Sequence, residues 1–256
     1  MAAPPRRSPR RRDALRLGGA WAADYAYAGW HQLRAALSRS GPDALLGPSA
    51  VDRPVPVVLL PGVYEPWRFL APLAQHLRRA GYPVHVVETL GLNRGPVLDM
   101  AHRAAEVLDT RDLRRVVLVA HSKGGLVGKQ LMLLPGAGDR ITGMVTVNTP
   151  FAGSRYARYL PGRTLRAFSP RDTALLALAR ERRVDARIVS VFARWDPHIP
   201  GGSTLAGARR NVRLDAVGHF RVLSDPAVLE VVLETVEEIA GTAAPSAGDP
   251  SGAPGA

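Results

Sequence analysis

The sequence predicts an α/β fold built on a doubly wound, mostly parallel sheet. From Val55 onward, short apolar runs rich in β-branched residues alternate with longer segments of helical periodicity. The runs are apolar at nearly every position, which is typical of strands that helices cover on both faces. In such a sheet we expect functional side chains beyond the carboxyl ends of the strands.

The alternation predicts each strand and helix in turn. The strands are expected at 55–60, 84–87, 115–120, 143–147, 187–193 and 211–216. The helices are expected at 66–80, 96–108, 124–134, 172–182 and 225–239. The last helix has a clear start signal, because Asp225 can cap its first turn and Pro226 suits the first helical position.

Length and composition indicate one main domain with a tail at each end. The chain has 256 residues, of which 46% are hydrophobic, and this is enough for one well-buried core. Residues 1–13, rich in Pro and Arg, and residues 241–256, rich in Ala, Gly and Pro, cannot bury enough apolar surface to offset ordering. Both are expected to be disordered. The main domain is expected over 51–240, with 151–185 as a small lid or cap insertion.

Residues 14–50 are expected to contain an amphipathic helix that lies on the domain or on a membrane surface. Apolar residues recur there at near-helical spacing: Trp21, Tyr25, Leu33 and Leu37. The alternative is a twin-arginine export signal, because basic residues from Arg11 onward precede an apolar stretch and 26–28 resembles a cleavage site. Arg16 and Asp24 interrupt that stretch, which favours the packed helix.

The formal net charge of +12 and the pI near 11.1 raise the question of a nucleic-acid partner, since clustered basic residues neutralise phosphates. The distribution of charge argues against it. Lysine occurs only at Lys123 and Lys129, and arginine is spread from Arg6 to Arg221 rather than gathered into a patch. Attraction to an anionic membrane or an acidic substrate is retained as an expectation, because net charge acts on association whatever its origin.

The chain has no cysteine, which excludes disulfides, thiol catalysis and thiolate metal sites but leaves the redox compartment undecided. No run of about 18 apolar residues occurs, so no transmembrane helix is expected. A cytoplasmic location with membrane association is the expectation, and export is the alternative.

Ser122 has the sequence context of a nucleophile elbow. The strand at 115–120 leads directly into His121-Ser122-Lys123-Gly124-Gly125, and a helical pattern follows. Such a turn is so tight that only small residues fit around the serine, whose hydroxyl is thereby exposed. Ala120 replaces the first glycine of the G-x-S-x-G pattern, which is the mildest departure. The alternative is a helix N-cap with a glycine-rich entry.

The loop that follows the first strand is the candidate for an oxyanion hole. Acyl transfer needs one backbone N–H from such a loop and a second from the residue after the nucleophile. Val63 and Lys123 are the candidates for these two amides. An ordinary strand-ending turn is the alternative for the loop.

Asp196 and His219 are the candidate partners of Ser122. Asp196 follows the strand at 187–193, and His219 follows the last strand. Serine, acid and histidine in this chain order, each at the carboxyl end of a strand, match one arrangement of the Ser-His-Asp triad. Asp215 is the rival acid, but it lies inside a strand pattern only four residues before His219. His198 is expected at the surface.

Over about residues 53–240 the chain resembles the bacterial triacylglycerol lipase and esterase branch of the α/β-hydrolase superfamily. The resemblance rests on the segments LLPGVYEPW, AHSKGG, VNTPFAGS, ARWDPHIP and GHF. It implies the α/β-hydrolase fold and an acyl pocket built in part by the T-P-x-x-G-S element. Pro61 stands before Gly62 where this family usually has His-Gly. Four residues are expected to bind substrate: Tyr64, Trp67, Pro150 and Phe151.

The resemblance implies a serine hydrolase that cleaves carboxylic esters through an acyl-enzyme on Ser122. Lipids or medium-chain esters are the expected substrates, because the apolar residues of 151–185 could receive an acyl chain and its arginines could meet a lipid surface. Two other functions stay open: thioester or amide hydrolysis on the same fold, and a binding protein without catalysis. Neither a metal nor an organic cofactor is expected. The segment 151–185 would either close over the site as a lid or simply cover the core.

Overall fold

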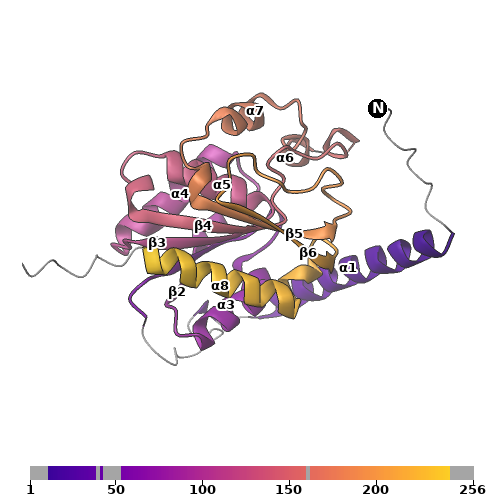
Figure 1. The fold of residues 1–256 in the computed structure, drawn as a ribbon, viewed down its shortest axis with the longest axis horizontal. Coiled ribbons are helices and arrows are strands. Elements are labelled where there is room, and N and C mark those ends of the chain that lie inside the picture. The colour runs from indigo at the N-terminus through magenta and orange to yellow at the C-terminus, as the bar shows by residue number, and fades with distance from the viewer. Residues whose placement is uncertain (1–10, 39–40, 43–52, 160–161, 243–256) are drawn as a thin grey trace, which may run out of the picture.

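The computed structural model describes residues 11–38, 41–42, 53–159 and 162–242, and its centre is a six-stranded sheet (Figure 1). The strand order is β2-β1-β3-β4-β5-β6, and every neighbouring pair is parallel. The strands are β1 (Val57–Leu60), β2 (Val84–Val86), β3 (Val116–His121), β4 (Ile141–Val147), β5 (Ile188–Trp195) and β6 (Arg210–Val217). Each overlaps a predicted strand, so the predicted doubly wound sheet is confirmed.

Helices cover both faces of the sheet (Figure 1). One face is covered by α4 (Val97–Thr110) and α5 (Lys123–Leu133), and the other by α3 (Ala71–Arg79) and α8 (Pro226–Thr242). The helix predicted at 66–80 is in fact a 3-10 turn, η1 (Trp67–Leu70), followed by α3. The predicted start of α8 is confirmed, because Asp225 Oδ1 accepts the Ala227 N–H at 3.0 Å.

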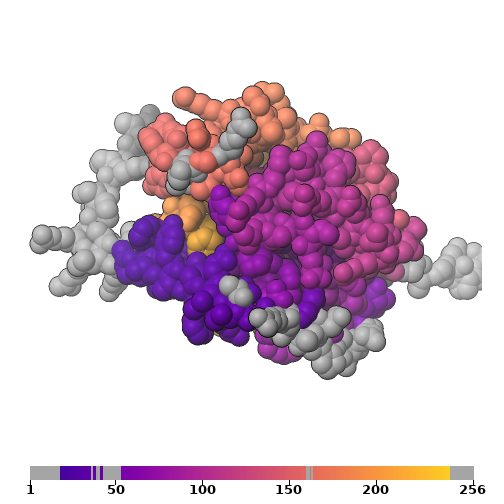
Figure 2. Space-filling view, turned by 180° about the vertical axis from the view of Figure 1, so that it is seen from behind, coloured from indigo at the N-terminus to yellow at the C-terminus, as the bar shows by residue number. Residues whose placement is uncertain are grey.

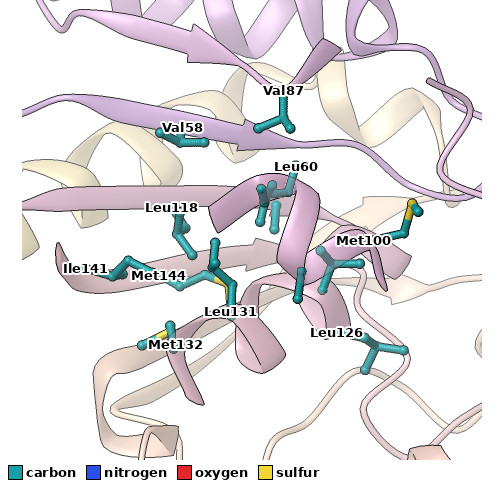
Figure 3. Close-up of a cluster of buried hydrophobic side chains, with 14 of the residues drawn as sticks. Val58, Leu60, Val87, Met100, Leu118, Leu126, Leu131, Met132, Ile141 and Met144 are labelled. Atoms are coloured by element: carbon teal, nitrogen blue, oxygen red, sulfur yellow. The ribbon is translucent and has the colours of Figure 1, made fainter. Parts of the chain in front are cut away.

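The core consists of two layers separated by the sheet. Alternate residues of β1 point into opposite layers: Val58 and Leu60 into the layer of α4 and α5, and Val57 and Leu59 into the layer of α3 and α8. Figure 3 shows part of the first layer, which includes Leu118 of β3 and Leu131 of α5. Burial on both faces explains why the strands are apolar at successive positions.

The segment 151–185 packs onto α5. It contains η4 (Ala157–Tyr159), α6 (Arg163–Arg166) and α7 (Thr173–Arg180), and it ends at η5 (Asp185–Arg187). Phe168, Leu175 and Leu178 are buried in the core layer of α4 and α5. These side chains therefore belong to the core, and the expected role of the segment as a lid stays a prediction.

The long N-terminal helix α1 (Arg11–Leu37) lies against η1 and against η6 (Arg221–Ser224). In Figure 2 it is the indigo element at the edge of the molecule. Residues 11–13 of the expected tail form the start of this helix, and α8 extends to Thr242. The rest of both tails, and 43–50 of the N-terminal segment, lie outside the described residues.

The face that α1 turns toward the domain coincides with the apolar stripe seen in the sequence only at Tyr25, whose hydroxyl reaches His198. Trp21, Tyr25, Leu33 and Leu37 are all exposed, whereas Asp24 is fully buried. Tyr27 of the packed face lies against Phe69 of η1. No helix in the described part of the chain is both long and apolar enough to span a bilayer.

Candidate active site

Ser122 stands at the turn between β3 and α5, with φ 50° and ψ −121°. A positive φ is strained for a residue with a side chain and persists only where the surrounding structure imposes it. A Cβ on Gly124 would lie 2.0 Å from the carbonyl oxygen of Leu60, and one on Gly125 would lie 2.1 Å from Oγ1 of Thr149. The two glycines therefore let α5 begin against the ends of β1 and β4, which is the geometry of a nucleophile elbow.

The structure brings Ser122, His219 and Asp196 together in one hydrogen-bonded chain. His219 Nε2 lies 2.9 Å from Ser122 Oγ, and His219 Nδ1 lies 2.6 Å from Asp196 Oδ2. All three residues are buried. Because the carboxylate accepts the Nδ1–H, Nε2 keeps its lone pair and can accept the serine proton, as in a Ser-His-Asp triad.

The rival acid Asp215 points away from this chain. Its side chain is 87% exposed and pairs with Arg194 at 2.5 Å. Asp196, in contrast, is held at the end of β5 by the N–H groups of His198 and Ile199, which donate to its Oδ1 at 2.7 and 3.1 Å. Its other oxygen is thereby left to His219.

The loop after β1 contains the residues expected to supply one oxyanion donor. The Gly62 N–H donates to Glu65 Oε2 at 2.6 Å, and the Tyr64 N–H donates to the carbonyl of Leu92 at 2.7 Å. Both are engaged, which leaves Val63 as the candidate donor in this loop. Lys123 is the first residue of α5, so its N–H has no intrahelical acceptor. Val63 and Lys123 therefore stay the predicted donors of an oxyanion hole.

The amine of Lys123 serves the neighbouring loop and not the triad. Its Nζ donates to the carbonyl oxygens of Asn93 and Gly95. Burial lowers the pKa of this amine to about 8. Asn93 in turn donates to the carbonyl of Pro61 at 2.7 Å, which ties this loop to the end of β1.

A model of the alpha/beta hydrolase family matches residues 57–200, more than half of the chain. The chain belongs to the alpha/beta hydrolase family. The match includes Ser122 and Asp196 and ends before His219, whose place is established by the distances above. No curated protein matches the chain by sequence.

Solved structures share the fold of this hydrolase at low sequence identity. The mature lipase of Bacillus licheniformis superposes with a TM-score of 0.60 at 15% identity, over 73% of this chain and 95% of that chain. Naproxen esterase from Bacillus subtilis superposes with a TM-score of 0.51 at 16% identity, over 75% of this chain and 84% of that chain. Aspergillus fumigatus lipase B superposes with a TM-score of 0.58 at 13% identity, over 76% of this chain and 57% of that chain. These similarities show the α/β-hydrolase fold.

Opposing effects set the protonation of the triad. Burial alone would raise the pKa of Asp196, but the charge and hydrogen bond of His219 outweigh it, so the pKa of Asp196 is lowered. Burial would lower the pKa of His219, but Asp196 outweighs it, so the pKa of His219 is raised above its usual 6.5. The pair is thus tuned so that the carboxylate stays charged while the imidazole takes up a proton.

His198 is not the surface residue that the sequence suggests. Its ring lies 4.7 Å from the ring of His219, and its Nε2 lies 2.8 Å from the hydroxyl of Tyr25. Burial, together with the charge of His219, lowers the pKa of His198 to about 4, so this ring is neutral near pH 7.

Two buried groups, His121 and Asn148, support the histidine loop, a role that the sequence did not reveal. His121 Nδ1 lies 2.9 Å from Glu65 Oε2, and its Nε2 donates to the carbonyl of His219 at 2.9 Å. Asn148 donates to the same carbonyl at 3.3 Å and accepts the Ala193 N–H at 2.9 Å. The only signal for them is their place at the ends of β3 and β4, where polar residues interrupt apolar runs.

The predicted substrate-binding residues occupy different environments. Tyr64 is 37% exposed and lies in the oxyanion loop, so it remains a candidate. Trp67 packs in the core with Leu59 of β1, so its position does not support the predicted substrate contact. Pro150 is buried after β4. Phe151 is buried in the layer of α4 and α5 and lines a cavity of about 190 Å³.

A cavity of about 710 Å³ lies at the opposite end of the sheet. Arg114, Arg115 and the segment 134–137 line it, and these residues precede β3 and β4. Within the described ranges, one trio of potential metal ligands comes together, Asp196, His198 and His219, with ligand atoms within 4.8 Å of one another. A metal ion there would compete with the hydrogen bond between Asp196 and His219.

We expect Asp196→Asn to keep the fold and to lower kcat by about ten-thousand-fold, because the amide favours the wrong tautomer of His219. Asp215→Asn should change kcat far less, since Asp215 lies on the surface beside Arg194. Steady-state kinetics of both variants, at matched thermal stability, decide between the acids. A larger loss in Asp215→Asn would contradict the geometry.

The raised pKa of His219 predicts the pH dependence of the hydrolase. His219 must be neutral to accept the serine proton, so kcat/KM should rise with pH through the pKa of the free enzyme. The midpoint of this limb is expected above 6.5, because the net effect on the pKa is upward. A pH profile with a midpoint below 6.5 would show that Asp196 does not dominate this site.

Proposed function

We propose that this hydrolase cleaves carboxylic esters through an acyl-enzyme on Ser122. The observation that carries the proposal is the buried chain from Ser122 Oγ through His219 to Asp196, with both contacts at hydrogen-bonding distance. The nucleophile, the base and the group that orients the base are therefore already in place.

In the first half-reaction, His219 accepts the Ser122 proton while Oγ attacks the ester carbonyl. The negative charge that develops on the carbonyl oxygen is held by the backbone N–H groups of Val63 and Lys123, which do not need to reorganise during the reaction. Asp196 stabilises the imidazolium. His219 then gives its proton to the departing alkoxide, which leaves as an alcohol.

In the second half-reaction, His219 removes a proton from a water molecule, which attacks the acyl-enzyme. The tetrahedral intermediate uses the same two amides, and its collapse returns the proton to Ser122 and releases the carboxylic acid. Each step is carried by this chain's own residues.

The preference for esters is supported by the known activities of three proteins with a similar fold. The proteins from Bacillus licheniformis and Aspergillus fumigatus are lipases, and that from Bacillus subtilis is an esterase. We infer lipids or medium-chain esters as the substrate class. The exposed ring of Tyr64 beside the oxyanion loop supports an apolar ligand at that edge.

A fluorophosphonate probe should label the purified protein at Ser122, because the probe reacts with a serine that has an adjacent base. Ser122→Ala should abolish labelling and lower kcat by about a million-fold, the loss seen when a triad nucleophile is removed. Mass spectrometry of the labelled peptide identifies the site. Labelling that persists in the variant would refute Ser122 as nucleophile.

A substrate panel separates ester hydrolysis from its alternatives. Hydrolysis of p-nitrophenyl esters of increasing chain length should exceed hydrolysis of matched acyl thioesters and anilides, with an optimum at medium chain length. Ser122→Ala serves as the control for spontaneous hydrolysis. Faster thioester or anilide turnover would replace the proposal by thioesterase or amidase activity, and no turnover of any substrate would favour a binding protein.

A further inference from the structure

The N-terminal helix α1 places a buried carboxylate directly behind the loop that carries His219. Asp24 is fully buried. Its Oδ2 accepts the His219 N–H at 2.9 Å, and its Oδ1 accepts the N–H groups of Phe220 and Arg221, each at 2.9 Å. Three consecutive amides thus converge on one carboxylate, and hydrogen bonds of this kind can hold a charge in a buried site.

Gly218 makes this approach sterically feasible. It has φ 111°, and a Cβ at this position would lie 2.5 Å from Asp24 Oδ1. Any side chain there would push the carboxylate away from the loop. Asp24 can therefore approach the loop only because position 218 has no side chain, although the two residues lie 194 positions apart in the sequence (218 − 24).

The histidine loop is held from both sides. Asp24 takes the N–H groups on one side, while Asn148 and His121 donate to the carbonyl oxygen of His219 on the other, at 3.3 and 2.9 Å. Asn148 and His121 stand at the ends of β4 and β3, whereas Asp24 reaches the loop from outside the sheet. The position of His219 relative to Ser122 thus depends on α1 as well as on the sheet.

Helix α1 also contacts the other two loops of the site. The hydroxyl of Tyr25 lies 2.8 Å from His198 Nε2 in the loop that carries Asp196. Gln32 donates to the carbonyl of Tyr64 in the oxyanion loop. One helix therefore touches the loops of the base, the acid and the oxyanion hole.

We propose that Asp24 is a positioning residue for His219, which makes α1 a working part of the active site. The inference rests on the proposed function, because Asp24 would act on proton transfer from Ser122 to His219. The proposal also has a consequence for the alternative of an export signal, which would be cut after Ala28. Such a cut would remove Asp24 and should impair the site.

The charge of Asp24 also affects the pKa of His219, which a purely structural contact would not do. The charged or titratable groups around His219 are Asp196, His198, His121, Glu65 and Asp24. Burial lowers the pKa of His219, whereas Asp196, Glu65 and Asp24 each raise it. Loss of the charge at position 24 should therefore lower the pKa of His219 and move the rising limb of its pH profile to lower pH.

The test is the second-order rate of fluorophosphonate labelling at Ser122, measured against pH in Asp24→Asn. We expect labelling to slow by about 100-fold, the order of loss that a small misplacement of a catalytic group produces. We expect the rising limb to shift to lower pH. Asp139→Asn removes the same charge from an exposed position at the far end of the sheet and should match the wild type.

A folded Asp24→Asn that labels at the wild-type rate with an unshifted limb would overturn the inference. If this variant does not fold, Gly218→Ala displaces the carboxylate while keeping its charge, and wild-type labelling in that variant would overturn the inference equally. Amide hydrogen exchange of the wild type gives an independent measure: slow exchange at 219–221 supports the contact, and rapid exchange refutes it. If the wild type is not labelled, the proposed function is contradicted. The hydrogen-exchange result would then still test whether Asp24 binds the amides of 219–221.

Discussion

The close approach of α5 to the ends of β1 and β4 is the constraint on which the rest of the site depends. Gly124 and Gly125 allow it, because any Cβ there would collide with Leu60 or Thr149. The same packing holds Ser122 at a positive φ of 50°, directly before the first residue of α5. The positive end of the helix dipole then favours the developing negative charge. Ser122 and the first residue of α5, the proposed oxyanion donor, are thus positioned by one contact.

The histidine cannot be fixed in that way, because it follows the strand at the edge of the sheet. Its loop is held instead by buried polar groups, which must be paired to be tolerated in the core. Asp24, Asn148 and His121 satisfy the loop's N–H and carbonyl groups, and Glu65 pairs with His121. Their common effect is a base that is oriented before substrate arrives, which is the condition for efficient electrostatic catalysis.

The fold and the chemistry are supported by different observations. The family match and the similar solved structures establish the fold, yet that fold serves many reactions. Catalysis is supported by the distances within the triad. Selection among esters, thioesters and amides depends on the pocket walls, for which Tyr64 and the segment 151–185 are the nearest candidates.

The sequence by itself determined the strands, most helices, the nucleophile elbow and the order of serine, acid and histidine. These features follow from local patterns: apolar runs, tight glycine turns and polar residues at strand ends. Chain order also favoured Asp196 over Asp215. Only the tertiary structure decided that His198 lies beside His219, that Trp67 belongs to the core and that Asp24 supports the histidine loop. Such contacts join residues far apart in the chain, so no local periodicity encodes them, and a buried acid on a helix looks in sequence like any solvated one.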